Sequence, residues 1–198
     1  GEMFGNADTT PQDETTRFNP RSIYGISKVA GYHLVRNYRR QHGLFCCAGI
    51  LYNHESPRRG FAFVTRKITS TVAKIHLGLA NRLELGNLDA RRDWGYSPEY
   101  VAAMHAMLSQ ESPEDYVIAT GKTHSVREFL QAAFDCIGKD YRGYVRSSSE
   151  YFRADETVPL CGNAAKAARR LGWQPVKTFP EIVSEMVHAD IALLQRAE

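Results

Sequence analysis

The sequence lacks the long apolar and cysteine-rich segments that mark membrane and secreted proteins. Its longest uncharged and mostly apolar run, residues 44–52, is less than half as long as the roughly 20 residues needed to cross a bilayer. The four cysteines show no CxxC spacing, and no charged-then-apolar segment resembles a secretory signal. We therefore expect a cytoplasmic protein with no membrane association.

The whole sequence has a small net charge, but one segment of it is strongly basic. The 25 basic and 22 acidic residues give a net charge of +3, which is too small to indicate a nucleic-acid partner. Residues 57–92 contain eight basic and two acidic residues, so this segment carries +6 and the remainder carries −3. This distribution favours a local anionic ligand, and a solvated helix and loop surface is the alternative.

Closely spaced glycines are also absent. None of the 15 glycines stands two residues from another, so the G-x-G-x-x-G turn is not present. In dinucleotide-binding domains that turn lets the backbone approach a pyrophosphate. If the chain belongs to such a domain, we expect it to lack the glycine-rich half.

What is present is an alternation of helical and strand-like patterns without internal repeats. Helical spacing runs over residues 22–42, with Ile26, Ala30 and Leu34 on one side, and Gly43 follows as a stop signal. Residues 45–52 are apolar throughout, which is typical of an interior strand of a parallel sheet, and the polar loop 53–60 follows. The pattern continues with expected helices at 64–79, 97–109, 125–138, 163–171 and 178–195 and expected strands at 82–85, 116–119 and 141–145. The alternation predicts an α/β fold with ligands at the carboxyl ends of its strands.

Tyr24 and Lys28 form the first candidate for chemistry. They lie four residues apart on the expected first helix, so both side chains share one face. A lysine ammonium beside a phenol stabilises the phenolate, so the tyrosine can remove a proton from a sugar hydroxyl near neutral pH. The pair alone is a weak signal, because two such residues also meet by coincidence on a helix surface.

The surrounding motifs strengthen this signal. They are EMFG at 2–5, PRSIYGISK at 20–28, GILYNHESPRRG at 49–60, FVTRK at 63–67, LGNLD at 85–89 and RDWG at 92–95. Together they resemble the GDP-mannose 4,6-dehydratase family of extended short-chain dehydrogenases/reductases, and the resemblance covers nearly the whole chain. It implies the carboxy-terminal part of a doubly wound Rossmann-like sheet plus a smaller α/β substrate-binding domain. Residues 1–60 and 110–121 would be the remnant of the dinucleotide-binding domain, and 61–109 and 122–198 the nucleotide-sugar-binding domain.

The resemblance also implies a reaction, an internal redox cycle with loss of water from GDP-mannose. Tyr24 would take the proton of the mannose 4-hydroxyl while NADP accepts the hydride, and Lys28 would hold the nicotinamide ribose. Glu2 would remove the C5 proton and help expel the 6-hydroxyl, and return of the hydride would give GDP-4-keto-6-deoxymannose. The chain would thus be a hydro-lyase of the route to GDP-fucose and other GDP-6-deoxyhexoses.

Further residues match binding positions of the family. The resemblance assigns His54 and Arg59 to the cofactor, together with Tyr24 and Lys28. The positions that it assigns to the GDP-sugar are Asn53, Val64, Lys67, Arg92, Arg153 and Glu156. The chain departs from the family pattern at Ala154, where the family usually has proline, and at Gly1, because a Ser/Thr pair normally precedes the catalytic glutamate.

Alternatives to a working dehydratase remain open at this stage. The chain is either part of such an enzyme or a non-catalytic GDP-sugar-binding or oligomerising fragment, and a GDP-sugar epimerase or reductase is a lesser option. If it is the whole polypeptide, we predict that it neither holds NADP tightly nor turns over. The family assembles as dimers or tetramers, which implies a homo-oligomer. We expect no metal, because the adjacent side chains of His54 and Glu55 diverge at a strand end.

Overall fold

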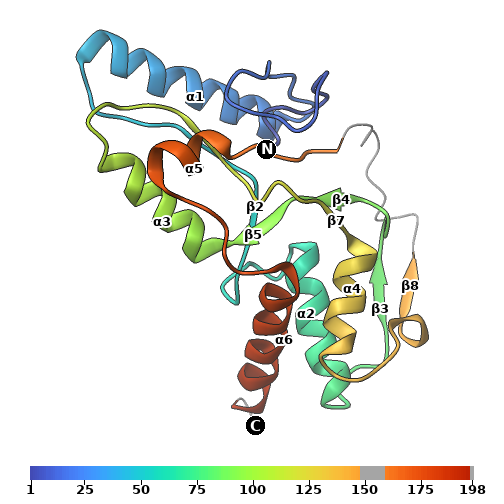
Figure 1. Cartoon of the computed structure of the whole chain (residues 1–198). Coiled ribbons are helices and arrows are strands. Elements are labelled where there is room, and N and C mark those ends of the chain that lie inside the picture. The colour runs from blue at the N-terminus through green and yellow to red at the C-terminus, as the bar shows by residue number, and fades with distance from the viewer. Residues whose placement is uncertain (148–158, 197–198) are drawn as a thin grey trace. The chain divides into compact units, whose positions relative to one another are not determined.

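The computed structural model describes residues 1–147 and 159–196, in which helices and short strands alternate (Figure 1). The helices are α1 (Ile23–His42), α2 (Val64–His76), α3 (Ser97–Leu108), α4 (Val126–Asp135), the 3₁₀ turn η1 (Tyr141–Gly143), α5 (Ala165–Leu171) and α6 (Phe179–Gln195). The strands are β1 (Gly49–Leu51), β2 (Asn53–Glu55), β3 (Leu83–Leu85), β4 (Arg91–Arg92), β5 (Trp94–Tyr96), β6 (Tyr116–Ile118), β7 (His124–Ser125) and β8 (Val145–Ser147). The order confirms the predicted α/β class.

The strands pair two by two. β1 runs parallel to β6, with Ile50 opposite Val117, and β3 runs parallel to β8, with Glu84 opposite Arg146. β2 pairs with β5, and β4 pairs with β7. Parallel partners that are far apart in the sequence require crossover connections, which the helices between them provide.

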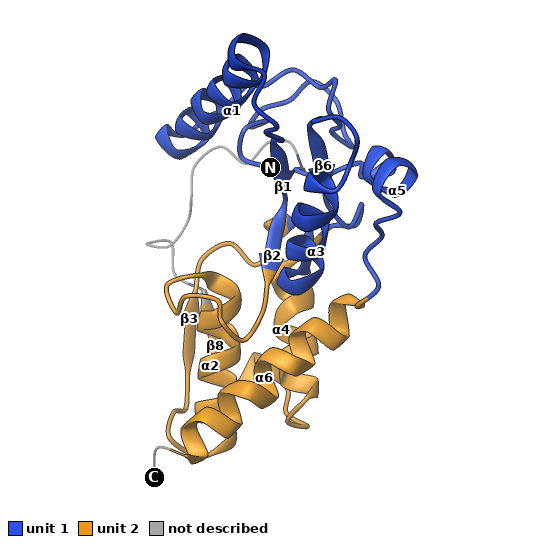
Figure 2. Cartoon of the chain, turned by 90° about the vertical axis from the view of Figure 1, so that its left-hand side faces the viewer, with its two compact units in different colours: residues 1–54, 92–123, 156–176 blue, residues 55–91, 124–155, 177–198 orange. Residues whose placement is uncertain are grey.

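The chain forms two compact units, which Figure 2 shows in different colours. Unit 1 comprises Gly1–His54, Arg92–Thr123 and Glu156–Val176, and unit 2 comprises Glu55–Arg91, His124–Asp155 and Lys177–Glu198. In unit 1, one core cluster gathers around Phe4, Ile50 and Val117, and another around Tyr100 and Ile118. In unit 2, helices α2, α4 and α6 pack against one another. The sequence-based division by function stays a prediction.

Local sequence signals placed several helix ends correctly. The Ser22 hydroxyl accepts from the Gly25 amide at 3.0 Å at the start of α1, and Gly43 ends that helix with φ of +63°. Ser125 and Glu128 form the predicted capping box of α4. These ends were predictable because each depends on residues within one helical turn.

The strand predictions were partly wrong. Residues 45–52 were expected to form one buried strand, but the strand β1 covers only Gly49–Leu51, and Phe45 is exposed. The Ala48 amide donates to the Asp115 carboxylate at 3.0 Å, so a side chain replaces a strand partner there. Residues 53–55, expected in a loop, form β2, because pairing with β5 uses backbone groups that any side chain allows.

Other boundaries shifted in a similar way. No strand was expected in residues 86–96, but this stretch contains β4 and β5. The expected strand at 141–145 is instead the turn η1, whose preceding Asp140 accepts from the Arg142 amide at 3.0 Å, and β8 begins only at Val145. The helix expected at 64–79 ends at His76, before Gly78 with φ of +76°.

The side of α1 that is buried is not the side that the sequence pattern suggested. Gly25 is the buried residue of this helix, and Val29 and Tyr32 pack against the core of unit 1. Ile26 and Leu34 are exposed in the structure, as is Ile23 with 83% of its surface accessible. No helix among the described residues has the length and apolarity needed to span a membrane.

Candidate active site

Tyr24 and Lys28 lie together at the start of α1 in unit 1. The Lys28 ammonium is 5.2 Å from the centroid of the Tyr24 ring, a distance at which the cation and the ring attract each other. Tyr24 is 60% exposed, so its phenol is accessible to a substrate. The arrangement provides a phenol with a neighbouring positive charge, which is what a base for hydroxyl protons requires.

The Glu2 backbone lies against the first turn of α1 because Gly25, the residue after Tyr24, has no side chain. A Cβ atom at Gly25 would lie 2.7 Å from the Glu2 carbonyl oxygen, so only glycine permits this approach. On the other side, the Gly1 nitrogen donates to the Leu51 carbonyl at the end of β1, at 2.7 Å. The backbone of Glu2 is therefore fixed between the carboxyl end of β1 and the first turn of α1.

The rest of the EMFG motif anchors this segment. Phe4 is fully buried, and its ring lies 5.3 Å from that of Phe18 and 6.2 Å from that of Tyr52. Gly5 has φ of +52°, and a Cβ there would overlap the Asn19 carbonyl. The motif thus combines one candidate catalytic residue with the packing that holds it in place.

Gln12 is a buried residue that sequence reasoning missed. Its Oε1 accepts from the Tyr52 hydroxyl at 2.8 Å and from the Cys161 amide at 3.0 Å, while its Nε2 donates to the Thr9 carbonyl at 2.7 Å. Burial raises the pKa of Tyr52, so this phenol stays a hydrogen-bond donor. No local pattern could have revealed Gln12, since its partners Tyr52 and Cys161 are 40 and 149 residues away.

The RDWG motif is organised around Asp93. This fully buried carboxylate accepts hydrogen bonds from the Thr120 amide at 2.9 Å, the Thr120 hydroxyl at 2.6 Å, the Gly121 amide at 3.0 Å and the Gly162 amide at 3.2 Å. Burial raises the pKa of Asp93 against the opposing effect of these donors. Sequence reasoning singled out the neighbouring Arg92 and missed the anchoring role of Asp93.

Asn53 and His54 follow Tyr52 on β2. The His54 ring lies 5.0 Å from the ring of Tyr100, and its Nδ1 is 2.8 Å from the Tyr52 carbonyl oxygen. A nitrogen that faces a carbonyl carries the proton as donor, which leaves Nε2 as the nitrogen for any further partner. The contact with the Tyr52 carbonyl fixes the orientation of the His54 ring.

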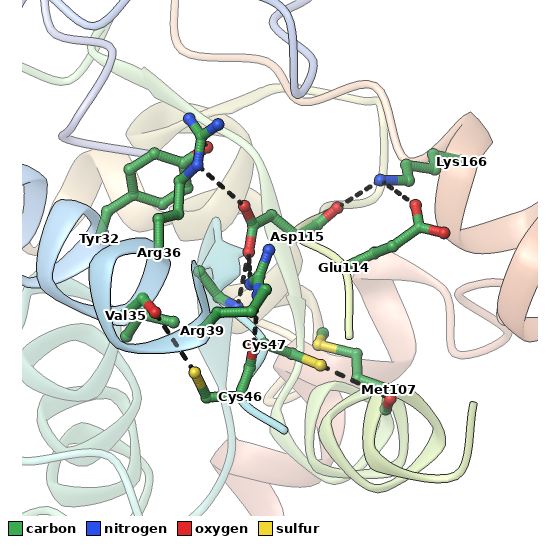
Figure 3. A network of polar contacts seen from close by, with 11 residues as sticks. Tyr32, Val35, Arg36, Arg39, Cys46, Cys47, Met107, Glu114, Asp115 and Lys166 are labelled. Atoms are coloured by element: carbon green, nitrogen blue, oxygen red, sulfur yellow. Dashed lines mark hydrogen bonds and ion pairs between the residues drawn. The ribbon is translucent and has the colours of Figure 1, made fainter. Parts of the chain in front are cut away.

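A charged network joins α1 to β1 and β6 (Figure 3). Asp115, just before β6, forms an ion pair with Arg39 and lies 3.9 Å from Arg36, while Lys166 donates to its backbone carbonyl at 2.8 Å. Arg39 also donates to the Cys46 carbonyl at 2.7 Å. The helix that carries Tyr24 and Lys28 is therefore fixed at its far end as well as at its start.

The adjacent cysteines lie on opposite sides of the segment before β1 (Figure 3). The Cys46 thiol donates to the Val35 carbonyl of α1 at 3.3 Å, and the Cys47 thiol contacts the Met107 carbonyl of α3 at 3.7 Å. Both are free thiols. Their packing role agrees with the absence of any metal-ligating group of three or more His, Cys, Asp or Glu within residues 1–147 and 159–196.

The candidate binding residues of unit 2 surround the start of α2. Arg59 lies with its guanidinium carbon 3.7 Å from the centroid of the Phe63 ring and its Nε 3.4 Å from the buried Glu55 carboxylate. Val64 is the first residue of α2 and is exposed, and Lys67 follows one turn later. Burial raises the pKa of Glu55, which the nearby Arg59 partly opposes.

The predicted site residues are thus divided between the two units. Unit 1 holds Glu2, Tyr24, Lys28, Asn53, His54 and Arg92, and unit 2 holds Arg59, Val64 and Lys67. Arg153 and Glu156 lie outside the described residues. The structure brings Glu2 to the start of the helix that carries Tyr24 and Lys28, and the roles assigned to all these residues stay predictions.

The fold is shared with solved proteins, one of which is a dTDP-glucose 4,6-dehydratase. The chain resembles the structure of RMD from Pseudomonas aeruginosa complexed with NADPH, with a TM-score of 0.90 and 23% identity over 98% of this chain and 65% of that one. It also resembles dTDP-glucose 4,6-dehydratase from Bacillus anthracis in complex with NAD, with a TM-score of 0.82 and 21% identity over 95% of this chain and 58% of that one. These likenesses define the class of the fold, which is a Rossmann-like α/β fold.

The sequence then specifies the family within that class. The profile of the GDP-mannose 4,6 dehydratase family matches residues 1–186, so the chain belongs to this family. It is 50% identical to GDP-mannose 4,6 dehydratase 2 of Caenorhabditis elegans over 98% of this chain and 55% of that protein. With the human GDP-mannose 4,6 dehydratase the identity is 46%, over 98% of this chain and 57% of that protein. The chain spans about half the length of the curated relatives it matches.

Proposed function

We propose that the protein containing this chain is an NADP-dependent GDP-mannose 4,6-dehydratase that produces GDP-4-keto-6-deoxymannose. The observation that carries the proposal is the Tyr24–Lys28 pair with the Glu2 backbone against the adjacent Gly25, in a chain of this family. Loss of water from a sugar needs one base for a hydroxyl proton and another for a carbon-bound proton. A phenol with a nearby ammonium and a carboxylate are suited to these two steps.

Each of the three residues has a distinct task in this proposal. Tyr24 removes the proton from the 4-hydroxyl, and Lys28 favours the phenolate that does so. A nicotinamide cofactor, when bound, supplies the acceptor for hydride from C4 and the donor of hydride to C6. Glu2 removes the C5 proton, which the 4-ketone has made acidic, and delivers a proton to the departing 6-hydroxyl. After hydride has been added at C6, a proton from solvent is returned to C5.

The proposed ligands are anionic, and the basic segment 57–92 provides the matching charge. For the cofactor we propose Arg59 and His54, because the Arg59 guanidinium is held against Phe63 yet 22% of its side chain is exposed. For the GDP-sugar we propose Asn53, Val64, Lys67 and Arg92, together with Arg153 and Glu156 beyond the described residues. An arginine fork matches phosphate oxygens in pairs, which makes these positions chemically suitable.

The proposal extends to the organisation of the protein. We propose that residues 1–60 and 110–121 serve the dinucleotide and that 61–109 and 122–198 serve the nucleotide sugar. The protein acts in the cytoplasm as a homo-oligomer in this proposal, and its cofactor is NADP. The solved relatives with NADPH or NAD in their names support a nicotinamide dinucleotide in general.

The test is turnover of GDP-mannose by the full gene product that contains this chain, followed by mass spectrometry and NMR. In D₂O the product should carry deuterium at C5, because the proton that is returned to C5 comes from solvent. Tyr24→Phe should lower kcat by about 10²-fold or more, whereas Tyr38→Phe, an exposed tyrosine of the same helix, should not. Glu2→Gln should still oxidise C4 but release no water.

Two results would contradict the proposal. A folded wild-type protein that leaves GDP-mannose unchanged in the presence of NADP is not this dehydratase. A Tyr24→Phe variant with wild-type kcat would remove the tyrosine from the mechanism. The 198-residue chain assayed alone should not turn over, as expected from the absence of a glycine-rich turn.

A further inference from the structure

Arg59 is held on two sides within unit 2. Its guanidinium stacks on the ring of Phe63, the residue before α2, at 3.7 Å. Its Nε faces the Glu55 carboxylate at 3.4 Å, and that carboxylate also accepts from the Thr65 hydroxyl at 2.6 Å. The side chain of Arg59 therefore has a defined place before any ligand binds.

The backbone of Arg59 is held from the last helix. Asp190 of α6 accepts from Arg66 Nε at 2.9 Å, lies 2.6 Å from Arg66 NH2, and accepts from the Thr69 hydroxyl at 2.7 Å. The remaining terminal nitrogen of Arg66 donates to the Arg59 carbonyl at 3.3 Å. Asp190 thus fixes Arg66, and Arg66 connects α6 to the loop that carries Arg59.

Stability alone is a poor reason for this arrangement. The Arg66 and Asp190 side chains are only 6% and 2% exposed, and the cost of removing both charges from water roughly cancels their attraction. A well-packed apolar pair of similar size would stabilise the helices at least as well. A fixed guanidinium fork, in contrast, gives the neighbouring loop one defined position.

We propose that Asp190 is a positioning residue, which acts through Arg66 to hold Arg59 ready for a phosphate group of the dinucleotide. This inference rests on the proposed function, because it takes Arg59 as a phosphate-binding residue. Asp190 and Arg66 themselves do not touch the ligand in this scheme. Pre-ordering Arg59 lowers the entropy that binding would otherwise cost.

The test measures NADPH binding to the full gene product by the fluorescence of the nicotinamide. Asp190→Asn should raise the Kd on the order of tenfold and leave kcat at saturating NADPH nearly unchanged. The double variant Arg66→Met with Asp190→Leu removes the charges but keeps the packing, so it should fold and show the same weakened binding. Ser125→Ala, which removes the cap of α4 in the same unit, is the control for lost stability and should bind as the wild type does.

A double-mutant cycle with Arg59→Ala separates positioning from a general structural effect. If Asp190 acts through Arg59, Asp190→Asn has no further effect on the Kd once Arg59 is alanine. Two results would overturn the inference. One is an equal effect of Asp190→Asn on the Kd in both backgrounds, and the other is a wild-type Kd in the double variant Arg66→Met with Asp190→Leu. Neither result would contradict the proposed function if the protein still turns over GDP-mannose. A wild-type protein that neither binds NADPH nor dehydrates GDP-mannose would overturn the proposed function and this inference together.

Discussion

Replacement of Asp93 by alanine is predicted to destabilise unit 1 strongly. The change removes the acceptor for the amides of Thr120, Gly121 and Gly162. The Thr120 hydroxyl keeps a second acceptor, the Lys122 carbonyl at 3.1 Å. A buried donor without a partner costs about 1–3 kcal/mol. Only the hydrogen bond from the Gly162 amide is fully buried, and those from Thr120 and Gly121 are partly buried, so we expect a loss of about 2–3 kcal/mol in the free energy of unfolding.

The assay is urea unfolding followed by tryptophan fluorescence. Both tryptophans, Trp94 and Trp173, belong to unit 1, so the signal reports that unit. Asp93→Asn keeps one acceptor oxygen but places an NH₂ group against two amides, and it should fall between alanine and the wild type. Thr120→Val removes only the hydroxyl and should cost about 1 kcal/mol. A loss below about 1 kcal/mol for Asp93→Ala would refute the reasoning.

The pH dependence gives a second check on Asp93. Because burial raises its pKa in the folded state, the folded protein binds the proton more tightly than the unfolded chain does. The contribution of Asp93 to the free energy of unfolding is therefore largest below the ordinary aspartate pKa and decreases as the pH rises through the raised pKa. This decrease should be absent from the Asp93→Asn variant, which has no titrating group at that position.

Three further variants test other contacts. Gly25→Ala should push the Glu2 backbone away and lower kcat/KM of the full gene product at least about tenfold. Gly31→Ala is the control: a Cβ there has nothing within 4 Å, so this variant should raise the melting temperature. Equal kcat/KM values for the two variants would contradict the close approach of the Glu2 backbone to Gly25. Gln12→Leu leaves the buried partners of this side chain unpaired, and chemical denaturation should show a loss of about 2–3 kcal/mol. Ser125→Ala should cost about 1 kcal/mol in the same experiment by loss of its cap, and an unchanged midpoint would argue against the capping box.

The sequence predicted what depends on neighbouring residues. Ser22 and Gly43 marked the ends of α1 because helix caps are local, and the YGISK motif placed Tyr24 and Lys28 on one helix face. The EMFG motif identified Glu2, although not the reason for its position. That reason is the missing side chain of Gly25, which faces the Glu2 carbonyl.

Long-range partners could not be predicted in this way. Arg66 and Asp190 are 124 residues apart, and neither stands in a pattern that points to the other. Asp93 binds mainly backbone amides, which every residue but proline carries, so its partners leave no signature in the sequence. The strand β2 is polar and was expected to be a loop, because its pairing with β5 depends on the backbone of a distant segment.

The interleaving of the two units has a consequence for synthesis of the protein on the ribosome. Unit 1 includes residues from Gly1 to Val176, and Gln12 bonds to Cys161, which is 149 positions later. The core of unit 1 therefore stays incomplete until its third stretch has left the ribosome, and unit 2 waits for α6. Since domains normally fold in turn as the chain emerges, these two must instead fold late and almost together, and neither can be excised as one continuous piece.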